Sequence, residues 1–231
     1  MTIIMPTSAV CAVCGERSGQ AYLKSTNGTG DFDLDFRRHG MIRDTINVWI
    51  SSCPYCGYCA PNISRYLKKT KEVVMSEEYQ RQRMDTRYPD KANEFLCSSM
   101  VYEGSGSYGM AAQYCLYAAW ICDDIGHNKE SVELRGRVVD LIGEAVRRSQ
   151  PLRCCPKGGE DILLIDLLRR SGRFEEAKDG CDNVLNGKIR TYPQLKKGLA
   201  LSEDLKTQLI RYESELIVRN DSSRHSYFEI I

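Results

Sequence analysis

Two short cysteine motifs carry the clearest chemical signal in this sequence. The first reads Cys11-Ala-Val-Cys14-Gly15 and the second reads Cys53-Pro54-Tyr55-Cys56-Gly57. Two residues between the cysteines let one tight turn present both sulfurs to one ion, and the following glycine lets the backbone turn over the metal. Two such knuckles supply four thiolates, the closed tetrahedral set of structural zinc. The sequence therefore predicts one structural Zn²⁺, with the ligands Cys11, Cys14, Cys53 and Cys56.

Other interpretations of these cysteines have less support. A redox dithiol needs its pair at a strand-to-helix junction in a βαβ unit, and neither motif has that setting. An iron–sulfur segment is suggested by the spacing that continues to Cys59, but the cysteine expected before Pro61 is missing. Four sulfur ligands also leave no open position for catalysis. The role of Cys59 stays open, as do those of the adjacent loop residues Cys154 and Cys155.

Composition limits the cellular setting and the class of partner. Eleven cysteines are an odd number, and the start of the chain lacks the charged and long apolar regions of a secretory signal. We therefore expect a cytoplasmic protein with reduced thiols and no membrane segment. The net charge of +1 gives no global attraction to nucleic acid, so a nucleic-acid partner is disfavoured.

Two regions of different character meet near Pro61. Residues 1–61 lack a helical period, and the alternation in 46–50 predicts a strand that leads into Cys53, with 20–24 as its partner. Residues 62–231 show helical patterns over 62–70, 76–86, 91–103, 108–125, 129–149, 160–171, 173–186 and 202–219. We expect a mainly α protein, in which a small β-rich zinc ribbon (1–61) precedes a helical-hairpin domain (62–231).

A weak repeat supports helical hairpins. Gly106, Tyr108, Ala111 and Cys115 recur 66 residues later as Gly172, Phe174, Ala177 and Cys181. That shift is about twice the ~34-residue period of tetratricopeptide repeats. Glycine permits a tight turn between helices, an aromatic residue fills the space between them, and alanine lets them touch. The domain is therefore expected to be tetratricopeptide-like, although the Trp and Leu-Gly half of that signature is absent.

Charged residues offer a second set of candidates. Asp31, Asp33 and Asp35 alternate with apolar residues, which places their carboxylates on one side of an extended segment. They could bind a cation, but pairing with Arg37, Arg38 or Arg43 is favoured. Asp123 and Asp124 oppose the dipole at a helix C-terminus, which hints at binding to arginine or lysine of a partner. The basic run Arg65, Lys68, Lys69 and Lys71 is typical of a solvated helix face.

Several of these motifs together resemble a known bacterial family. They are Asp33-Leu34-Asp35-Phe36-Arg37, Arg43, Trp49 and Cys53-Pro54-Tyr55-Cys56-Gly57-Tyr58. The combination resembles domain-of-unknown-function family 2225, whose members pair a CPxCGY zinc-knuckle module with a tetratricopeptide-like tail. The resemblance covers the N-terminal third well and the helical part loosely. It implies zinc and helices, and it implies no reaction.

Three functions are compatible with these features. The first is a zinc-binding, non-enzymatic scaffold whose helical domain holds a protein or peptide. The second is a nucleic-acid-associated zinc-ribbon protein. The third is a cation-assisted enzyme that uses the segment Asp31, Asp33 and Asp35. A polar or apolar groove would favour the scaffold. A basic surface with aromatic residues would favour the nucleic-acid-associated protein, and convergent carboxylates in a pocket would favour the enzyme. Oligomeric state and pathway are not encoded in these patterns.

Overall fold

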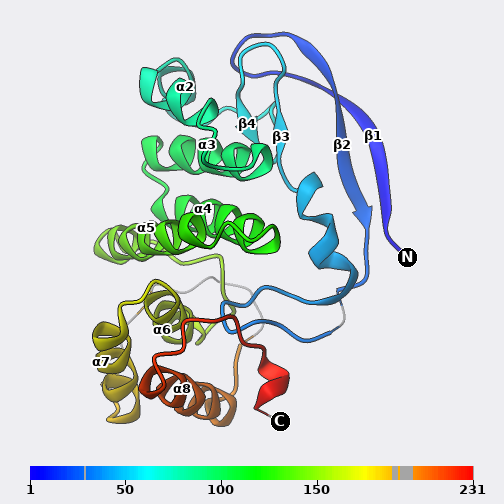
Figure 1. Cartoon of the computed structure of the whole chain (residues 1–231). Helices are drawn as coiled ribbons and strands as arrows, with labels where there is room; N and C mark the ends of the chain where they lie inside the picture. The colour runs from blue at the N-terminus through cyan, green and yellow to red at the C-terminus, as the bar shows by residue number, and fades with distance from the viewer. Residues whose placement is uncertain (29, 189–191, 193–199, 231) are drawn as a thin grey trace.

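The helices stack in one column, and the cysteine-rich segment runs along its side (Figure 1). This arrangement comes from a computed structural model, which describes residues 1–28, 30–188, 192 and 200–230. The N-terminal hairpin lies beside the upper helices, and the segment that follows it descends toward the C-terminal helices. Within the described residues, no helix has the length and apolarity needed to cross a bilayer. The mainly helical fold with a small β-rich N-terminal module is confirmed.

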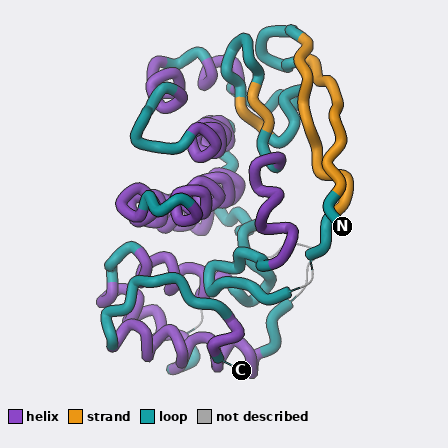
Figure 2. Tube along the Cα trace, turned by 45° about the vertical axis from the view of Figure 1, so that its right-hand side comes forward, coloured by secondary structure: helices purple, strands orange, loops and turns teal. Residues whose placement is uncertain are grey.

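Each cysteine motif forms the turn of its own small antiparallel hairpin. Strands β1 (Ile3–Val10) and β2 (Arg17–Ser25) pair so that Val10 faces Arg17 across the first motif. Strands β3 (Ser51–Ser52) and β4 (Cys59–Ala60) pair in the same way across the second. Figure 2 shows both pairs in orange. The predicted strand at 20–24 therefore exists inside β2, but its partner is β1 rather than 46–50.

The predicted strand over 46–50 is wrong. Residues Gly40–Val48 form the 3₁₀ helix η1. Thr45 donates to the carbonyl oxygen of Ile42 at 2.7 Å and accepts from the indole nitrogen of Trp49 at 2.9 Å. These hydrogen bonds join residues three and four apart, and the buried Ile46 and Ile50 have the same spacing. The apolar residues therefore fit a helical period as well as an alternating one, and the side-chain hydrogen bonds favour the helix.

Eight α-helices are formed by the described residues: α1 (Thr70–Val74), α2 (Glu77–Arg83), α3 (Asp90–Gly104), α4 (Tyr108–Asp124), α5 (Asn128–Arg147), α6 (Glu160–Arg170), α7 (Phe174–Leu185) and α8 (Glu203–Val218). All predicted helices from 76 onward are confirmed. The predicted helix over 62–70 is wrong, because residues 62–69 form a loop whose backbone binds residues of the N-terminal module. The backbone oxygen of Ile63 accepts from Ala12, and that of Arg65 accepts from the hydroxyl of Tyr58.

The 66-residue repeat corresponds to two three-helix units, α3–α4–α5 and α6–α7–α8. Gly106 and Gly172 end the first helix of each unit with φ near +80° (+82° and +78°), a conformation that favours glycine. The buried thiols of Cys115 and Cys181 donate to backbone oxygens of the third helix, at 3.7 and 3.8 Å. The repeat is therefore structural, whereas the tetratricopeptide geometry of the helix pairs remains a prediction.

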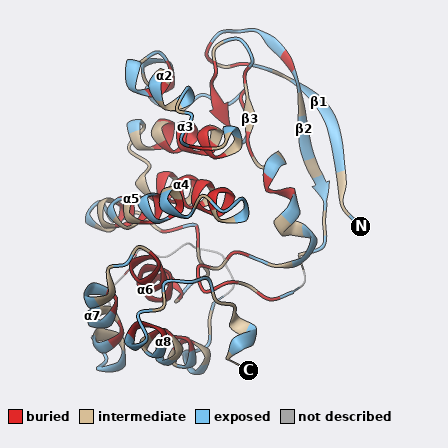
Figure 3. Ribbon diagram, in the orientation of Figure 1, coloured by how far each residue is buried: buried red, intermediate tan, exposed pale blue. Residues whose placement is uncertain are grey.

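Helix α4 occupies the centre of the first unit. Most of its residues are buried, because α3 and α5 pack against two of its sides. Figure 3 shows the same concentration of buried residues in α3, α4 and α6. Ala111, Ala118 and Ala119 have no exposed surface and let the neighbouring helices approach closely. A helix that is apolar on most sides has to lie between neighbours, and α4 does.

Candidate metal centre

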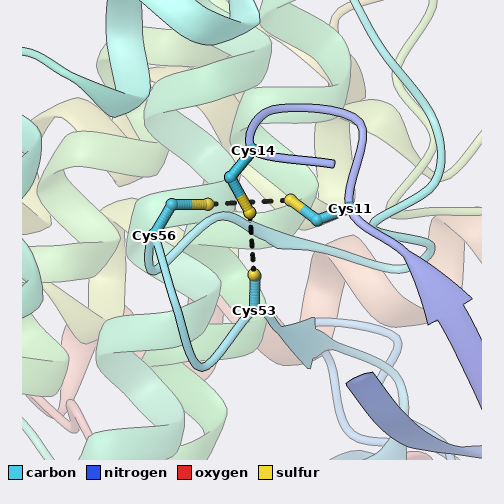
Figure 4. A group of neighbouring side chains, drawn as sticks. All are labelled: Cys11, Cys14, Cys53 and Cys56. Atoms are coloured by element: carbon cyan, nitrogen blue, oxygen red, sulfur yellow. Dashed lines mark hydrogen bonds between the residues drawn. The ribbon is translucent and has the colours of Figure 1, made fainter. Parts of the chain in front are cut away.

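The four predicted ligands lie together. The sulfurs of Cys11, Cys14, Cys53 and Cys56 are all within 4.8 Å of one another. The Cys11 and Cys56 sulfurs are 3.6 Å apart, and those of Cys14 and Cys53 are 3.7 Å apart. Four sulfurs placed about 2.3 Å from one ion form a tetrahedron with edges of about 3.8 Å. Figure 4 shows the four side chains pointing toward one another from two loops, so the group can hold a metal ion.

The two knuckles repeat one backbone geometry. In each, the N–H of the first cysteine donates to the residue five positions later, at 2.8 Å for Cys11 and 2.9 Å for Cys53. The N–H of Gly15 donates to the oxygen of Cys11, and that of Gly57 donates to the oxygen of Cys53, both at 2.9 Å. Both glycines have φ near +80° (+80° and +76°). The glycines thus close the turns as the sequence predicted.

The electrostatics of the four cysteines link their ionisation to the binding of a cation. Cys11 and Cys53 are 1% exposed, whereas Cys14 is exposed. Burial and neighbouring thiols raise the pKa of Cys56 far above its ordinary value, and burial raises the pKa of Cys11. Burial also acts against ionisation of Cys53, yet backbone hydrogen bonds from Cys56 and Tyr55 lower its pKa. Four adjacent thiolates would repel one another, and a divalent ion removes that repulsion.

The remaining cysteines lie outside this group. Cys59 is buried behind the second knuckle, where its thiol donates to the oxygen of Gly57 at 3.3 Å. It thereby supports the knuckle without being one of the four ligands. Cys154 and Cys155 belong to no cluster of three or more potential ligands among the described residues. The eleven cysteines are all free thiols.

The acidic segment is buried, and its carboxylates face different partners. Asp33 accepts from Arg43 at 2.9 Å and lies 2.6 Å from the Nε2 of His39. Asp31 accepts from the backbone N–H of Phe228 at 2.9 Å. The expected pairing with Arg43 is confirmed, whereas Arg37 and Arg38 bind elsewhere. The segment is therefore not an exposed strand face, because its side chains point into the fold.

Asp35 is the centre of a buried ion network that joins distant parts of the chain. Its Oδ2 accepts from Arg135 at 3.1 Å, from Arg170 at 3.0 Å and from the indole of Trp120 at 2.8 Å. Asp123 shares both arginines, at 2.7 and 2.8 Å. Burial opposes ionisation of Asp35, but the arginines hold its pKa below the ordinary value. The network thus fixes the cysteine module to α4, α5 and α6.

Asp124 completes the contact from the other side of the same helix end. It binds the guanidinium of Arg37, which also donates to the backbone oxygen of Trp120 at 3.0 Å. Asp123 and Asp124 therefore do bind arginines, but these belong to the same chain and not to a partner, as the sequence had suggested. Sequence reasoning missed Arg135 and Arg170, which lie 100 and 135 positions from Asp35.

The C-terminal tail closes over the acidic segment. Tyr227 donates through its N–H to Phe32 at 3.0 Å, and their rings stack with centroids 5.2 Å apart. Nearby, the Nε2 of His225 is 3.0 Å from Ser223, and its Nδ1 is 2.5 Å from Glu229. These distances are those of a nucleophile–base–acid triad, but Asp221 also binds Nε2 at 2.9 Å. A carboxylate on each ring nitrogen blocks the general-base role, so His225 serves as a structural link.

Comparison with known proteins does not assign the chain to a family. No family model matches it, and no curated protein or solved structure matches it either.

Proposed function

We propose that this protein is a zinc-binding, non-enzymatic scaffold or interaction protein, whose helical domain takes a protein or peptide ligand. The observation that carries the proposal is the group of four converging sulfurs, Cys11, Cys14, Cys53 and Cys56. The sulfur separations match a tetrahedral site, and an all-thiolate set favours zinc among the common intracellular metals. All four positions are filled by protein, which supports a structural role for the ion.

The N-terminal module (residues 1–61) supports the scaffold part of the proposal, because its potential metal site would stabilise the fold. Its two hairpins are short, and most side chains of β1 and β2 are exposed. Such a segment has too little buried apolar surface to fold alone, so the ion supplies the missing stabilisation. The resemblance to domain-of-unknown-function family 2225 agrees with this combination of zinc and helices, and membership in that family is part of the proposal.

Cobalt substitution tests the metal assignment directly. The purified chain should bind one Zn²⁺, and the Co²⁺ form should show the absorption of a tetrahedral tetrathiolate site. Cys14→Ser, at the exposed ligand, should reduce the thiolate-to-cobalt absorption without unfolding the helices. Cys155→Ser is the matched control and should leave the spectrum unchanged. A chain that binds no metal, or one whose Cys155→Ser variant loses it, would contradict the proposal.

A nucleic-acid-associated role is the second candidate, and one surface supports it. Arg65, Lys68, Lys69 and Lys71 are exposed and form no ion pair among the described residues, and Tyr66 between them is 53% exposed. Unpaired cations beside an exposed ring are features of single-strand binding. Binding of a fluorescent oligonucleotide should then fall steeply with salt and be weakened by charge reversal at Lys68 and Lys69. Salt-independent binding, or none, would remove this candidate.

The cation-assisted enzyme receives no comparable support. Asp33 and Asp35 are bound to arginines, and Asp31 accepts a backbone hydrogen bond. Their carboxylates do not form a cluster of potential metal ligands within the described part of the chain. A cation would therefore have to displace buried guanidinium groups, at a large cost in free energy.

A further inference from the structure

The C-terminal tail pairs with the acidic segment as an added strand. The chain turns back on itself over residues 31–39, and one edge of this turn faces the tail. On that edge, the N–H of Leu34 donates to the oxygen of His225 at 3.1 Å, and the oxygen of Phe32 accepts from the N–H of Tyr227 at 3.0 Å. Figure 1 shows the tail, in red, beside the segment that descends from the N-terminal hairpin. Without the tail, these backbone groups would form an open strand edge, with which an extended peptide can pair.

The tail is fixed at its base and more exposed beyond it. The buried guanidinium of Arg169 donates to the backbone oxygens of Asp221 and Ser223, at 2.6 and 2.9 Å. Residues 224–230 are all exposed or only partly buried, and Phe228 is 69% exposed. The tail can therefore leave the strand edge by a local opening that keeps the helical core closed.

One buried carboxylate beside the tail is only half satisfied. Asp31 is 6% exposed, and its Oδ2 accepts from the N–H of Phe228 at 2.9 Å, but its Oδ1 has no partner among the described residues. Asp33 and Asp35 are both paired with arginines, whereas no cation of the described residues pairs with Asp31. A buried carboxylate without a counter-charge is costly, and a cation on a ligand would remove that cost. This observation is independent of the strand pairing and indicates a basic ligand.

We propose that residues 224–230 are a releasable strap, which occupies in cis a site for an extended peptide of a partner protein. The partner peptide pairs with the same strand edge and carries an aromatic residue followed by a lysine or arginine. The aromatic residue takes the place of Tyr227, whose ring stacks on that of Phe32 with centroids 5.2 Å apart. The basic residue follows because the next backbone nitrogen, that of Phe228, is 2.9 Å from Asp31, within reach of its own long side chain.

The strap gives this site a threshold for ligands. A segment tethered by a few residues has an effective concentration on the order of millimolar, so a peptide of the same chemistry competes poorly from solution. A partner with a basic residue has the additional interaction with Asp31 that the strap lacks. The site lies on the N-terminal module, so it is separate from a ligand of the helical domain and from the four sulfurs.

Anisotropy of a labelled peptide with the sequence of residues 222–230, measured on the metal-loaded full chain, tests the strap. Phe228→Pro removes the N–H that binds Asp31 and should release the strap. This variant should bind the peptide at least about tenfold more tightly than wild type, because the tethered competitor is gone. Phe228→Ala is the matched control. It removes a mostly exposed side chain but keeps the N–H, so it should bind as weakly as wild type.

A change in the peptide tests the ligand chemistry. A peptide with Phe228→Lys should bind the Phe228→Pro chain about tenfold more tightly than the unaltered peptide, the usual gain for a hydrogen bond between charged groups. The gain should disappear when the chain also carries Asp31→Asn, because the double variant removes the carboxylate. A peptide with Tyr227→Ala should bind more weakly, since it lacks the ring that stacks on Phe32.

Hydrogen exchange of residues 225–230 shows whether the strap is released. Tyr227→Ala in the chain is a second way to release it, because this change removes the stacked ring and keeps every backbone donor. The proposal is overturned if the strap stays as protected as α8 in both variants, or if a released strap leaves peptide binding unchanged. It is also overturned if the gain from the lysine peptide survives Asp31→Asn. Metal content and circular dichroism of the same samples show that each variant is folded.

Discussion

Two regions of the N-terminal module (residues 1–61), the cysteine knuckles and the acidic segment 31–35, converge by opposite chemistries. The knuckles bring together four sulfurs that could hold a metal ion from outside the chain. The acidic segment is held by the chain's own arginines, which compensate Asp33 and Asp35 in the interior. The comparison shows that a segment with little core of its own can gather potential metal ligands in one region and be fixed by buried charge pairs in another.

The two attachments also differ in what their loss costs. Structural zinc contributes about 10–16 kcal/mol in small zinc-dependent peptides, and all of it disappears with the ion. Buried ion pairs contribute little net stability relative to apolar replacements, but removal of one partner leaves an uncompensated charge. We therefore expect loss of the ion to disorder both knuckles together. Single neutralising substitutions in the acidic segment should instead lower the free energy of unfolding.

The largest expected effect is that of Cys53→Ser. Loss of one thiolate should abolish tight metal binding and leave β1, β2 and both knuckles disordered, because these elements have little other buried contact. The helices should persist, since their core does not involve the metal. Metal analysis, circular dichroism and hydrogen exchange of residues 3–25 against 90–147 measure this contrast. Cys59→Ser should keep the ion, and retention of one metal per chain by Cys53→Ser would refute the assignment.

The next effect is that of Asp35→Asn in the acidic segment. Neutralisation leaves Arg135 and Arg170 with one shared carboxylate, so unfolding free energy should fall by about 3–5 kcal/mol. Asp31→Asn removes no arginine partner and should cost about 1 kcal/mol or less. Urea unfolding of both variants at neutral pH is the measurement. Equal losses for the two would show that the ion network does not anchor the segment.

A smaller effect concerns pH. Glu213 is buried beside Asp166 and Arg169, and burial raises its pKa to about 8 from the ordinary 4.5. The folded state then holds a proton that the unfolded state releases, so stability is complete below about pH 4.5 and falls as pH rises toward 8. The slope is at most about 1.4 kcal/mol per pH unit. In Glu213→Gln, the urea midpoint should depend less on pH between 5 and 8. An unchanged pH dependence would show that Glu213 is not its source.

The cysteine knuckles should respond to pH in the opposite direction. Thiolates must be deprotonated to bind an ion, so acid releases the metal. Hydrogen exchange across the pH range can therefore separate the two attachments. Loss of protection in residues 3–25 should occur in acid, whereas the stability change linked to Glu213 should occur toward alkaline pH.

The smallest effect compares the two knuckles. Gly15 and Gly57 both have φ near +80°, so an alanine costs roughly 1 kcal/mol at either position. A methyl group on Gly57 would also lie 2.5 Å from the guanidinium of Arg83, whereas Gly15 has open space. Competition with a chelator should show slightly weaker metal retention for Gly57→Ala. Combination with Arg83→Ala should remove that difference, and a persisting difference would place its cause elsewhere.

Local patterns account for what could be predicted from the sequence. The knuckles follow from a fixed spacing, and the helices from 76 onward follow from apolar periodicity with glycine breaks. The segment 46–50 has apolar residues that suit two periods, and the hydrogen bonds of Thr45 decided between them. The loop 62–69 is irregular because its backbone accepts a hydrogen bond from the first knuckle, a contact that no local pattern reveals.

The charge network could not be predicted, for a different reason. Asp35 meets Arg135 and Arg170 only because α4 and α6 both pack against α5. Nothing in the local sequences of the two arginines distinguishes them from surface arginines. The one available signal was the unfavourable pair Asp123 and Asp124 at a helix C-terminus. A residue that opposes the helix dipole has a compensating partner, but the sequence does not identify that partner.

The position of Asp35 bears on how the chain can be divided. Because composition changes near Pro61, residues 62–231 could be chosen for expression as a separate fragment. Such a fragment would keep both guanidiniums at the junction of α5 and α6 but lose the carboxylate that they share with the other piece. The interior of the helical half therefore contains two arginines whose shared partner, Asp35, belongs to residues 1–61. We therefore expect residues 62–231 to be less stable as a separate fragment than within the full chain.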